Sequence, residues 1–425
     1  MTSLRKAAAV LAVLAAVTLA GCTNTGHGPA AAKPDVAASQ PPCQDSIADG
    51  CRELSVGGRD YRYYVSPPPS GATGEALLVD LGGPGISLSS LLPPNYGDSF
   101  RKDLGPIADG KTLLLVEEPW VSGKADPACR ESSTAFYAWA RQNWRTMSAA
   151  TAPQMTCPWG QGTYGWNATT YRNVIQAITG REQITGVDMA AISFGAVRYT
   201  YISDLVGHVT LVRPAAAPGT NSDTVVEART RQVWKDLVAR CAGCTAGTVK
   251  RVVADTVRRY AGTTTELPDR SVPVNDFDIA SGLAAAGIST ADITLSWTSA
   301  THTVDLRTAA QLSDALWMRI GEQSVSPALV AYTDEYCQAY PAGHGSTGDD
   351  PIRAILNAPN LCNGRQAQTP VTTKPVDCLI IGADDSSAPA DLAATWKVNP
   401  GGITSVSTTR RHWFTDTARC AKEDK

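Results

Sequence analysis

The stretch Ala190-Ala191-Ile192-Ser193-Phe194-Gly195-Ala196 decides the fold class of this 425-residue chain. Ser193 follows an apolar run typical of a buried strand and precedes a pattern typical of a helix. A sharp strand-to-helix turn that exposes a nucleophilic serine needs small residues two positions before and after it, because those positions lie close to neighbouring backbone. Ala191 and Gly195 meet this requirement. A serine that caps the following helix would explain the same pattern, so the heptapeptide alone leaves both roles open.

Short apolar runs bounded by turn residues lie on both sides of this stretch and alternate with helical patterns. Leu113–Val116 is apolar throughout, as expected of a strand covered on both faces. The alternation predicts an α/β fold with a mostly parallel sheet and flanking helices. We expect strands over Tyr61–Val65, Ala76–Leu81, Thr112–Glu117, Gly186–Ile192, His208–Val212, Val376–Ile381 and Ile403–Thr408, and helices over Thr170–Thr179 and Ala196–Leu205.

The alternation stops near Thr220 and resumes near Thr373. The residues between are mostly helical by pattern. A helical block inserted into a parallel-sheet domain is expected to form a lid over the carboxyl ends of the strands, where such folds bind ligands. The predicted organisation is therefore a core over 43–219 and 373–425, interrupted by a helical lid over 220–372. The predicted lid helices are Asp223–Arg240, Thr248–Tyr260, Ala309–Ile320 and Pro327–Ala339.

A serine nucleophile needs a base, usually histidine, and the chain has five histidines. His27 lies near the N-terminus, His208 begins a strand that should be buried, and His302 and His344 fall in the helical block. His412 remains, a few residues after the last strand, where the chain order Ser, acid, His places the base. A solvated loop histidine is the alternative interpretation.

Two further elements complete the predicted site. The last strand but one runs into Asp384 and Asp385, and either carboxylate could hold the imidazole. A turn that merely contains two aspartates would look the same. The loop Gly82-Gly83-Pro84-Gly85 follows a strand, so the N–H of Gly83, with that of Phe194, could form an oxyanion hole. A plain glycine-rich turn is the alternative.

Together these features resemble the α/β-hydrolase superfamily, and more narrowly its secreted tripeptidyl and proline aminopeptidase branch. That branch carries a G-G-P-G loop, an acid in a pattern like G-x-x-D-x-x-x-P, and a histidine followed by a cysteine. Here Asp385 lies three residues after Gly382, and His412 lies eight residues before Cys420. The resemblance implies a catalytic triad of Ser193, Asp385 and His412, and it selects Asp385 over Asp384.

The chain also departs from the pattern of that branch. Glu118-Pro119-Trp120-Val121 stands where an acidic-Pro-Arg-Gly stretch is usual, and Ala191 stands where glycine is usual. Val212-Arg213-Pro214 replaces an Asp-Gly pair. These departures leave the substrate class open. By position, the resemblance makes Asp334 and Glu335 candidates for binding a substrate amine, and a solvated helix face is the alternative interpretation.

The N-terminus is typical of a bacterial lipoprotein leader. Arg5 and Lys6 precede an apolar run of 14 residues, Ala7–Ala20, which is too short to span a bilayer. The run ends in Leu19-Ala20-Gly21-Cys22, which resembles the lipobox in which the cysteine is lipidated. We therefore expect a signal peptide over 1–21, a lipid on Cys22, a flexible tether over 22–42, and a membrane location on the extracytoplasmic face of a bacterial envelope. Ordinary secretion is the alternative.

A lipidated Cys22 leaves ten of the eleven cysteines, an even number suited to an oxidising compartment. Spacing favours pairing of nearest neighbours, although sequence alone does not fix connectivity. The C-x-x-C at Cys241 and Cys244 has no second half that would complete a zinc site, which favours a disulfide. The expected pairs are Cys43–Cys51, Cys129–Cys157, Cys241–Cys244, Cys337–Cys362 and Cys378–Cys420.

Composition and motifs limit the function classes. The net charge of −3 argues against a nucleic-acid partner. The chain has no H-E-x-x-H, P-loop or G-x-G-x-x-G motif, so we expect neither a metal nor a nucleotide cofactor. The sequence predicts a monomeric, lipid-anchored serine hydrolase that acts on a peptide or small acyl substrate, releasing short peptides or residues from peptide N-termini. A carboxylester hydrolase and a catalytically inactive envelope binding protein are the alternatives.

Overall fold

The structure is a computed structural model that describes most of the chain after residue 42. The predicted signal peptide, Cys22 and the tether lie outside the described residues. None of the described helices is long and apolar enough to cross a membrane. The described residues are 43, 46–71, 73–119, 127–148, 150–155, 166–241, 243–288, 305–320, 324–341, 349–362, 374–409 and 411–421.

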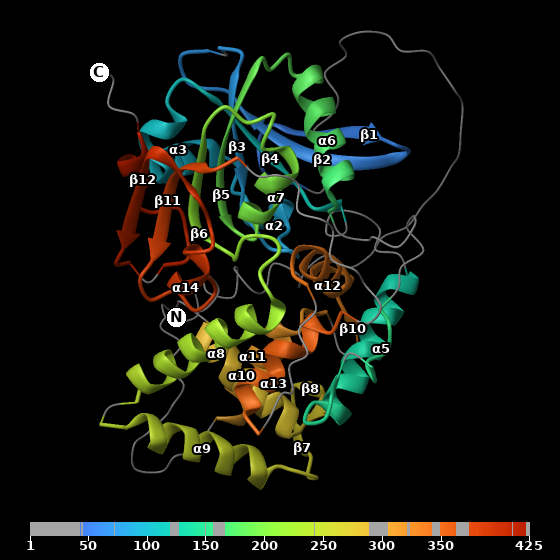
Figure 1. Ribbon diagram of the computed structural model, residues 1–425. Coiled ribbons are helices and arrows are strands. Elements are labelled where there is room, and N and C mark those ends of the chain that lie inside the picture. Colours follow the sequence, from blue (N-terminus) through green and yellow to red (C-terminus); the bar gives the residue numbers. More distant parts are fainter. Residues whose placement is uncertain are drawn as a thin grey trace, which may run out of the picture.

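An eight-stranded sheet forms the centre of the upper part of the molecule in Figure 1, in the order β1-β2-β4-β3-β5-β6-β11-β12. Strand β2 runs antiparallel to both β1 and β4, and the other neighbours are parallel. The mostly parallel sheet predicted from the sequence is confirmed. The strands are β1 Cys51–Val56, β2 Arg59–Ser66, β3 Glu75–Asp80, β4 Thr112–Val116, β5 Gly186–Ser193, β6 Val209–Pro214, β11 Val376–Gly382 and β12 Val398–Ser407.

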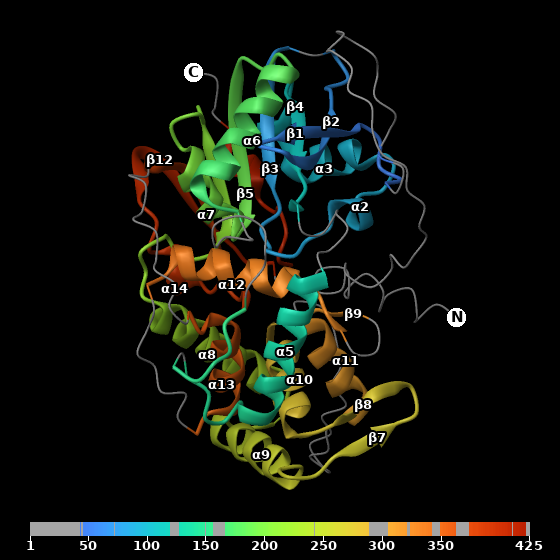
Figure 2. The ribbon, with the colours of Figure 1, turned by 90° about the vertical axis from the view of Figure 1, so that its right-hand side faces the viewer.

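Helices cover both faces of the sheet, which explains the uninterrupted apolar strands. Alternate residues of β4 enter different cores: Leu114 packs in one cluster, Leu113 and Leu115 in the other. The first core includes helices α6 and α7, and the second includes α2 and α3, which lie on opposite sides of the sheet in Figure 2. The bounds are α2 Leu88–Leu91, α3 Tyr96–Leu104, α6 Ala168–Arg181 and α7 Gly195–Ile202.

Between β6 and β11 the chain forms a second, mostly helical part, drawn below the sheet in Figures 1 and 2. Its helix α12 and helix α8 contact the loops that follow β3 and β11, at the carboxyl ends of the parallel strands. Its action as a lid stays a prediction. The inserted elements are α8 Ser222–Ala239, α9 Ala246–Arg259, β7 Thr265–Leu267, β8 Arg270–Val274, α10 Asp276–Ile288, α11 Leu306–Leu316, β9 Arg319–Ile320, β10 Ser324–Val325, α12 Ala328–Ala339 and α13 Pro351–Asn357.

One helix from outside the insertion packs with it. Helix α5, Pro127–Asn143, follows β4 in sequence but lies beside the inserted helices in both views. Ion pairs hold it there: Arg141 lies 2.6 Å from Asp278, and Arg145, just beyond the helix, lies 2.8 Å from Asp276. The chain therefore crosses between the two parts more than once.

Several elements escape the sequence patterns. Helix α10 is buried on all sides over Asp276–Gly287, so it lacks the one-sided apolar stripe that marks a surface helix. Strand β1 is a half-exposed edge strand paired only with β2 among the described strands. Strand β12 begins at Val398, five residues before the predicted start. The sequence pattern missed these residues because Asn399, Pro400, Gly401 and Gly402 are all residue types that are uncommon in strands.

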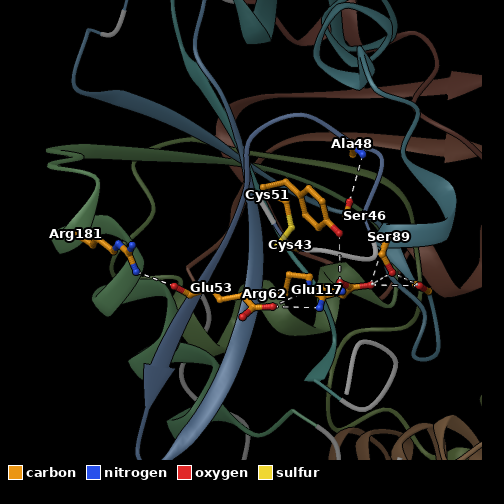
Figure 3. Close-up of a disulfide and its surroundings, with 11 residues drawn as sticks. Cys43, Ser46, Ala48, Cys51, Glu53, Arg62, Ser89, Glu117 and Arg181 are labelled. Atoms are coloured by element: carbon orange, nitrogen blue, oxygen red, sulfur yellow. Dashed lines mark hydrogen bonds and ion pairs between the residues drawn. A yellow bond between two sulfur atoms is a disulfide. The ribbon is translucent and has the colours of Figure 1, made fainter. Parts of the chain in front are cut away.

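The predicted nearest-neighbour disulfides are confirmed where both cysteines are described. Figure 3 shows the bond between Cys43 and Cys51, which ties the segment before the sheet to β1. Cys129 is also disulfide-bonded, and its predicted partner Cys157 lies outside the described residues. The other described bonds join Cys241 to Cys244, Cys337 to Cys362, and Cys378 to Cys420.

Candidate active site

Ser193 lies in a sharp turn between strand β5 and helix α7. It is the last residue of β5 and has φ 55°, a left-handed conformation that is uncommon for residues other than glycine. The helix is capped by Phe194 with no side-chain hydrogen bond, so Ser193 is not the helix cap that the sequence left open. The turn explains the small neighbours, because a Cβ on Gly195 would lie 2.6 Å from Asp80 Oδ1.

The glycine loop Gly82–Gly85 lies directly against this turn. A Cβ on Gly82 would come within 2.9 Å of Ser193 Cβ and 3.1 Å of the Phe194 nitrogen. Gly82, Gly83 and Gly85 all have positive φ values, between 78° and 110°, which other residues rarely adopt. The structure therefore places the loop that contains Gly83, through Gly82, against Ser193 and Phe194.

Acidic side chains fix the backbone of this loop. Asp80 Oδ1 accepts a 2.9 Å hydrogen bond from the N–H of Gly82, and Glu118 accepts one from the N–H of Gly85. Glu117 accepts a 3.1 Å bond from the N–H of Ser89, in the helix that follows the loop (Figure 3). Asp80 thus accepts a backbone N–H before Gly83, and Glu118 and Glu117 accept backbone N–H groups after it. No described residue accepts a hydrogen bond from the N–H of Gly83 itself.

Asp385 and His412 meet at the ends of neighbouring strands. His412 Nδ1 lies 2.6 Å from Asp385 Oδ2, and Asp385 is fully buried. The other carboxylate oxygen accepts the N–H groups of Ser387 and Ala388 at 2.9 and 3.1 Å. Asp384, in contrast, is partly exposed and pairs with Lys235 at 2.7 Å. The structure therefore brings Asp385, and not Asp384, to His412.

The ionised form of Asp385 is favoured despite its burial. Burial alone would raise the pKa of this carboxyl group. His412, Arg213 and the hydrogen bond from Ala388 outweigh that effect and hold its pKa below the usual value. Asp385 can therefore serve as a fixed negative charge that orients the imidazole.

Arg213 is a member of the site that the sequence did not assign. It lies in β6 with φ 46° and is fully buried. Its guanidinium donates to Asp385 Oδ2 at 3.1 Å, to Ser407 Oγ at 3.0 Å and to the carbonyl of Thr409 at 2.6 Å. It thus ties Asp385 to the end of β12. The only sequence signal was the replacement of the usual Asp-Gly pair at this position.

Replacing Arg213 by Met is expected to lower the free energy of unfolding by about 3–5 kcal/mol, because it leaves part of a buried charge pair uncompensated. The loss should shrink in acid: Asp385 has a lowered native pKa, so its pairing stabilises the fold above about pH 4 and fades as pH falls through that native pKa. Urea unfolding at several pH values measures both effects. Arg231→Met, which removes exposed ion pairs with Glu227 and Asp391, is the control and should cost less than about 1 kcal/mol. Equal losses in the two variants would contradict the role of Arg213.

The two residues suggested for amine binding lie inside the protein. Asp334 and Glu335, in α12, are both buried, so the alternative of a solvated helix face is wrong. Glu335 accepts hydrogen bonds from Arg198 Nε at 3.0 Å and from the backbone N–H of Trp166 at 3.1 Å. Arg198 thus already supplies a cation for the carboxylate of Glu335.

Of the remaining histidines, the structure describes His208 alone. His208 is half-buried, with Nδ1 3.9 Å from Asp377 Oδ2, at the start of β6. His27, His302 and His344 lie outside the described residues. Within the described part of the chain, no group of three or more His, Cys, Asp or Glu side chains is arranged to hold a metal ion.

The sheet, the turn at Ser193 and the flanking helices define an α/β-hydrolase fold. The chain is similar to a proline iminopeptidase from Mycobacterium smegmatis, with 12% identity over 85% of this chain and 92% of that chain and a TM-score of 0.34. It is also similar to an enol-lactonase from Burkholderia xenovorans, with 10% identity over 84% and 91% of the two chains and a TM-score of 0.32. No family model and no curated protein matches the sequence. Since these scores are low, the fold class rests on the strand order and the turn.

Proposed function

We propose that this protein is an extracytoplasmic serine hydrolase in which Ser193, His412 and Asp385 form the catalytic triad. The observation that carries the proposal is the 2.6 Å contact between His412 and a fully buried Asp385, two strands away from a serine held in a left-handed turn. We would not expect this contact between a solvated loop histidine and an aspartate that merely forms part of a turn. The position of the glycine loop beside Ser193 supports acyl transfer as the reaction class.

The arrangement suits a two-step reaction. Because Nδ1 of His412 faces Asp385, its Nε2 is the nitrogen left to take the proton from the Ser193 hydroxyl. The oxygen of Ser193 then attacks the substrate carbonyl, and the N–H groups of Gly83 and Phe194 stabilise the negative charge on the carbonyl oxygen. His412 returns the proton to the leaving group. Water, activated in the same way, releases the acyl group from Ser193.

For the substrate we propose the N-terminal end of peptides, with release of short peptides or single residues. The support is the G-G-P-G loop, the acid pattern and the His–Cys pair of the sequence, which resemble the tripeptidyl and proline aminopeptidase branch. The triad itself serves an ester equally well, so a carboxylester hydrolase is the second candidate. An inactive binding protein is the third, since Ala191 and Val212-Arg213-Pro214 depart from the pattern of the branch.

A fluorophosphonate probe and a substrate panel test this proposal. We expect the probe to label the folded protein, with the modified peptide mapping to Ser193. Aminoacyl- and tripeptidyl-arylamides should be cleaved faster than short acyl esters. No labelling of folded protein would support the binding protein, faster cleavage of esters would support the esterase, and equal cleavage of an amine-blocked arylamide would exclude an aminopeptidase.

We further propose that the protein is anchored to the bacterial membrane through a lipid on Cys22. The support is the apolar run that ends in Leu19-Ala20-Gly21-Cys22. Mass spectrometry of the mature protein from a bacterial host should give an N-terminal Cys22 that carries a lipid. Cys22→Ala should move the protein from the membrane to the soluble fraction. A mature, unmodified chain that begins elsewhere would indicate ordinary secretion instead.

A further inference from the structure

Arg198 lies five residues after Ser193, in helix α7, and is almost completely buried. Its guanidinium contacts carboxylates from three other elements: Asp80 at 3.2 Å, Glu118 at 2.5 Å and Glu335 at 3.0 Å. Asp80 ends β3, Glu118 follows β4, and Glu335 belongs to α12 of the inserted part. One side chain thus joins the helix that follows the serine to the ends of strands β3 and β4 and to the insertion. We refer to these four residues as the Arg198 cluster.

The Arg198 cluster holds the glycine loop at both ends. Arg198 donates a 3.0 Å hydrogen bond to the carbonyl of Gly82, and Asp80 accepts from the N–H of the same residue. At the other end, Glu118 accepts the N–H of Gly85. The carbonyl of Gly82 and the N–H of Gly83 belong to the same peptide group. The hydrogen bond from Arg198 to that carbonyl therefore helps to fix the direction of the Gly83 N–H.

The cluster contains one cation and three carboxylates, all buried. Burial raises the pKa of both Glu118 and Glu335, with Arg198 acting in the opposite direction. Tyr171, from α6, donates to Asp80 Oδ2 at 2.7 Å, and Tyr201 also lies close to Glu335. Removing the guanidinium would leave these carboxylates without a cation. The loop would then lose both its direct bond to Arg198 and the fixed position of its acceptors.

We propose that Arg198 is a positioning residue that aligns the Gly83 N–H with the developing oxyanion, and that Glu335 extends this alignment to the inserted helices. The inference rests on the proposed hydrolase function but not on the choice between peptide and ester. An oxyanion donor acts only if it is correctly placed where negative charge develops in the transition state. Loss of alignment should therefore lower kcat and leave substrate binding largely unchanged.

The test compares Arg198→Lys and Arg198→Met with Arg231→Met, which removes the exposed ion pairs of Arg231 with Glu227 and Asp391. We expect kcat to fall about 10²–10³-fold in Arg198→Met, as when an oxyanion donor is lost, with KM little changed. Arg198→Lys keeps the charge but cannot reach three carboxylates and Gly82 at once. Its kcat should therefore lie between that of Arg198→Met and that of Arg231→Met. Arg231→Met should match the wild type. A folded Arg198→Lys or Arg198→Met with wild-type kcat would overturn the inference.

Hydrogen–deuterium exchange provides a readout that does not depend on activity. In Arg198→Lys the amides of Gly82 and Gly85 should exchange faster, while those of β4 and β5 stay protected. A uniform increase across the sheet would show a general loss of stability and would also overturn the inference. If the wild type itself fails to react with the fluorophosphonate, the proposed function fails. A labelled wild type with an unaffected glycine loop in the variants would refute the role of Arg198 alone.

Discussion

Ser193→Ala is expected to abolish fluorophosphonate labelling and to lower kcat by about 10⁶-fold, the loss typical of removing a triad nucleophile. Alanine keeps the small volume of serine at this turn but has no oxygen to attack a carbonyl. The left-handed φ of 55° is retained by either residue at similar cost, so the fold should survive. Intact-protein mass spectrometry after probe treatment measures labelling, and arylamide turnover measures kcat.

Ser203→Ala is the matched control for this variant. Ser203 follows the last residue of the same helix and is also buried, but it is not a member of the proposed triad. We expect it to label and turn over substrate like the wild type. Continued labelling of Ser193→Ala at another residue would identify a different nucleophile and refute the triad.

Asp385→Asn is expected to lower kcat by about 10⁴-fold. Because it leaves the buried Arg213 without this counter-charge, it should also lower the free energy of unfolding by about 3–5 kcal/mol. Asparagine is isosteric and can still accept from the N–H groups of Ser387 and Ala388. It removes the negative charge that His412 and Arg213 both contact, so the imidazole loses its fixed tautomer and the support for its protonated form. Steady-state kinetics, together with a thermal unfolding curve, separates this effect from loss of structure.

The neighbouring Asp384→Asn supplies the control. Asp384 is partly exposed and pairs with Lys235 on α8, and exposed pairs contribute little to stability. We expect kcat within a factor of about two of the wild type, since the change in free energy is a few tenths of a kcal/mol. If the two variants lost activity equally, the assignment of the acid to Asp385 would be wrong.

The elements that the sequence predicted well are those with local signals. Strand β4 is apolar on both faces because two cores cover it, and this leaves a run that cannot be mistaken for a surface helix. The small residues on either side of Ser193 predict the turn at this position. Elimination could select His412 as the candidate base because the chain has only five histidines. The contact of His412 with Asp385 agrees with the chain order of the superfamily.

The two arginines of the site had no comparable signal. Arg198 meets Asp80 and Glu335 across 118 and 137 residues of sequence, and Arg213 meets Asp385 across 172. When a single charged residue lies within an apolar helix or strand, no periodicity or spacing in the sequence predicts which residue it pairs with. Its partners follow only from the tertiary packing. The sequence did not predict helix α10, because this helix is buried on every side and therefore has no alternation of apolar and polar faces.

The four described disulfides each close within one part of the molecule. Cys43–Cys51 and Cys378–Cys420 belong to the sheet, and Cys241–Cys244 and Cys337–Cys362 belong to the insertion. None of these four bonds crosses between the parts, whereas the ion pair of Arg198 with Glu335 does. These disulfides therefore stabilise each part separately against unfolding. Burial raises the pKa of Glu335, so protonation of this carboxylate would weaken the ion pair that joins the two parts. We therefore expect reduction of the disulfides and acidification to affect this protein in different ways.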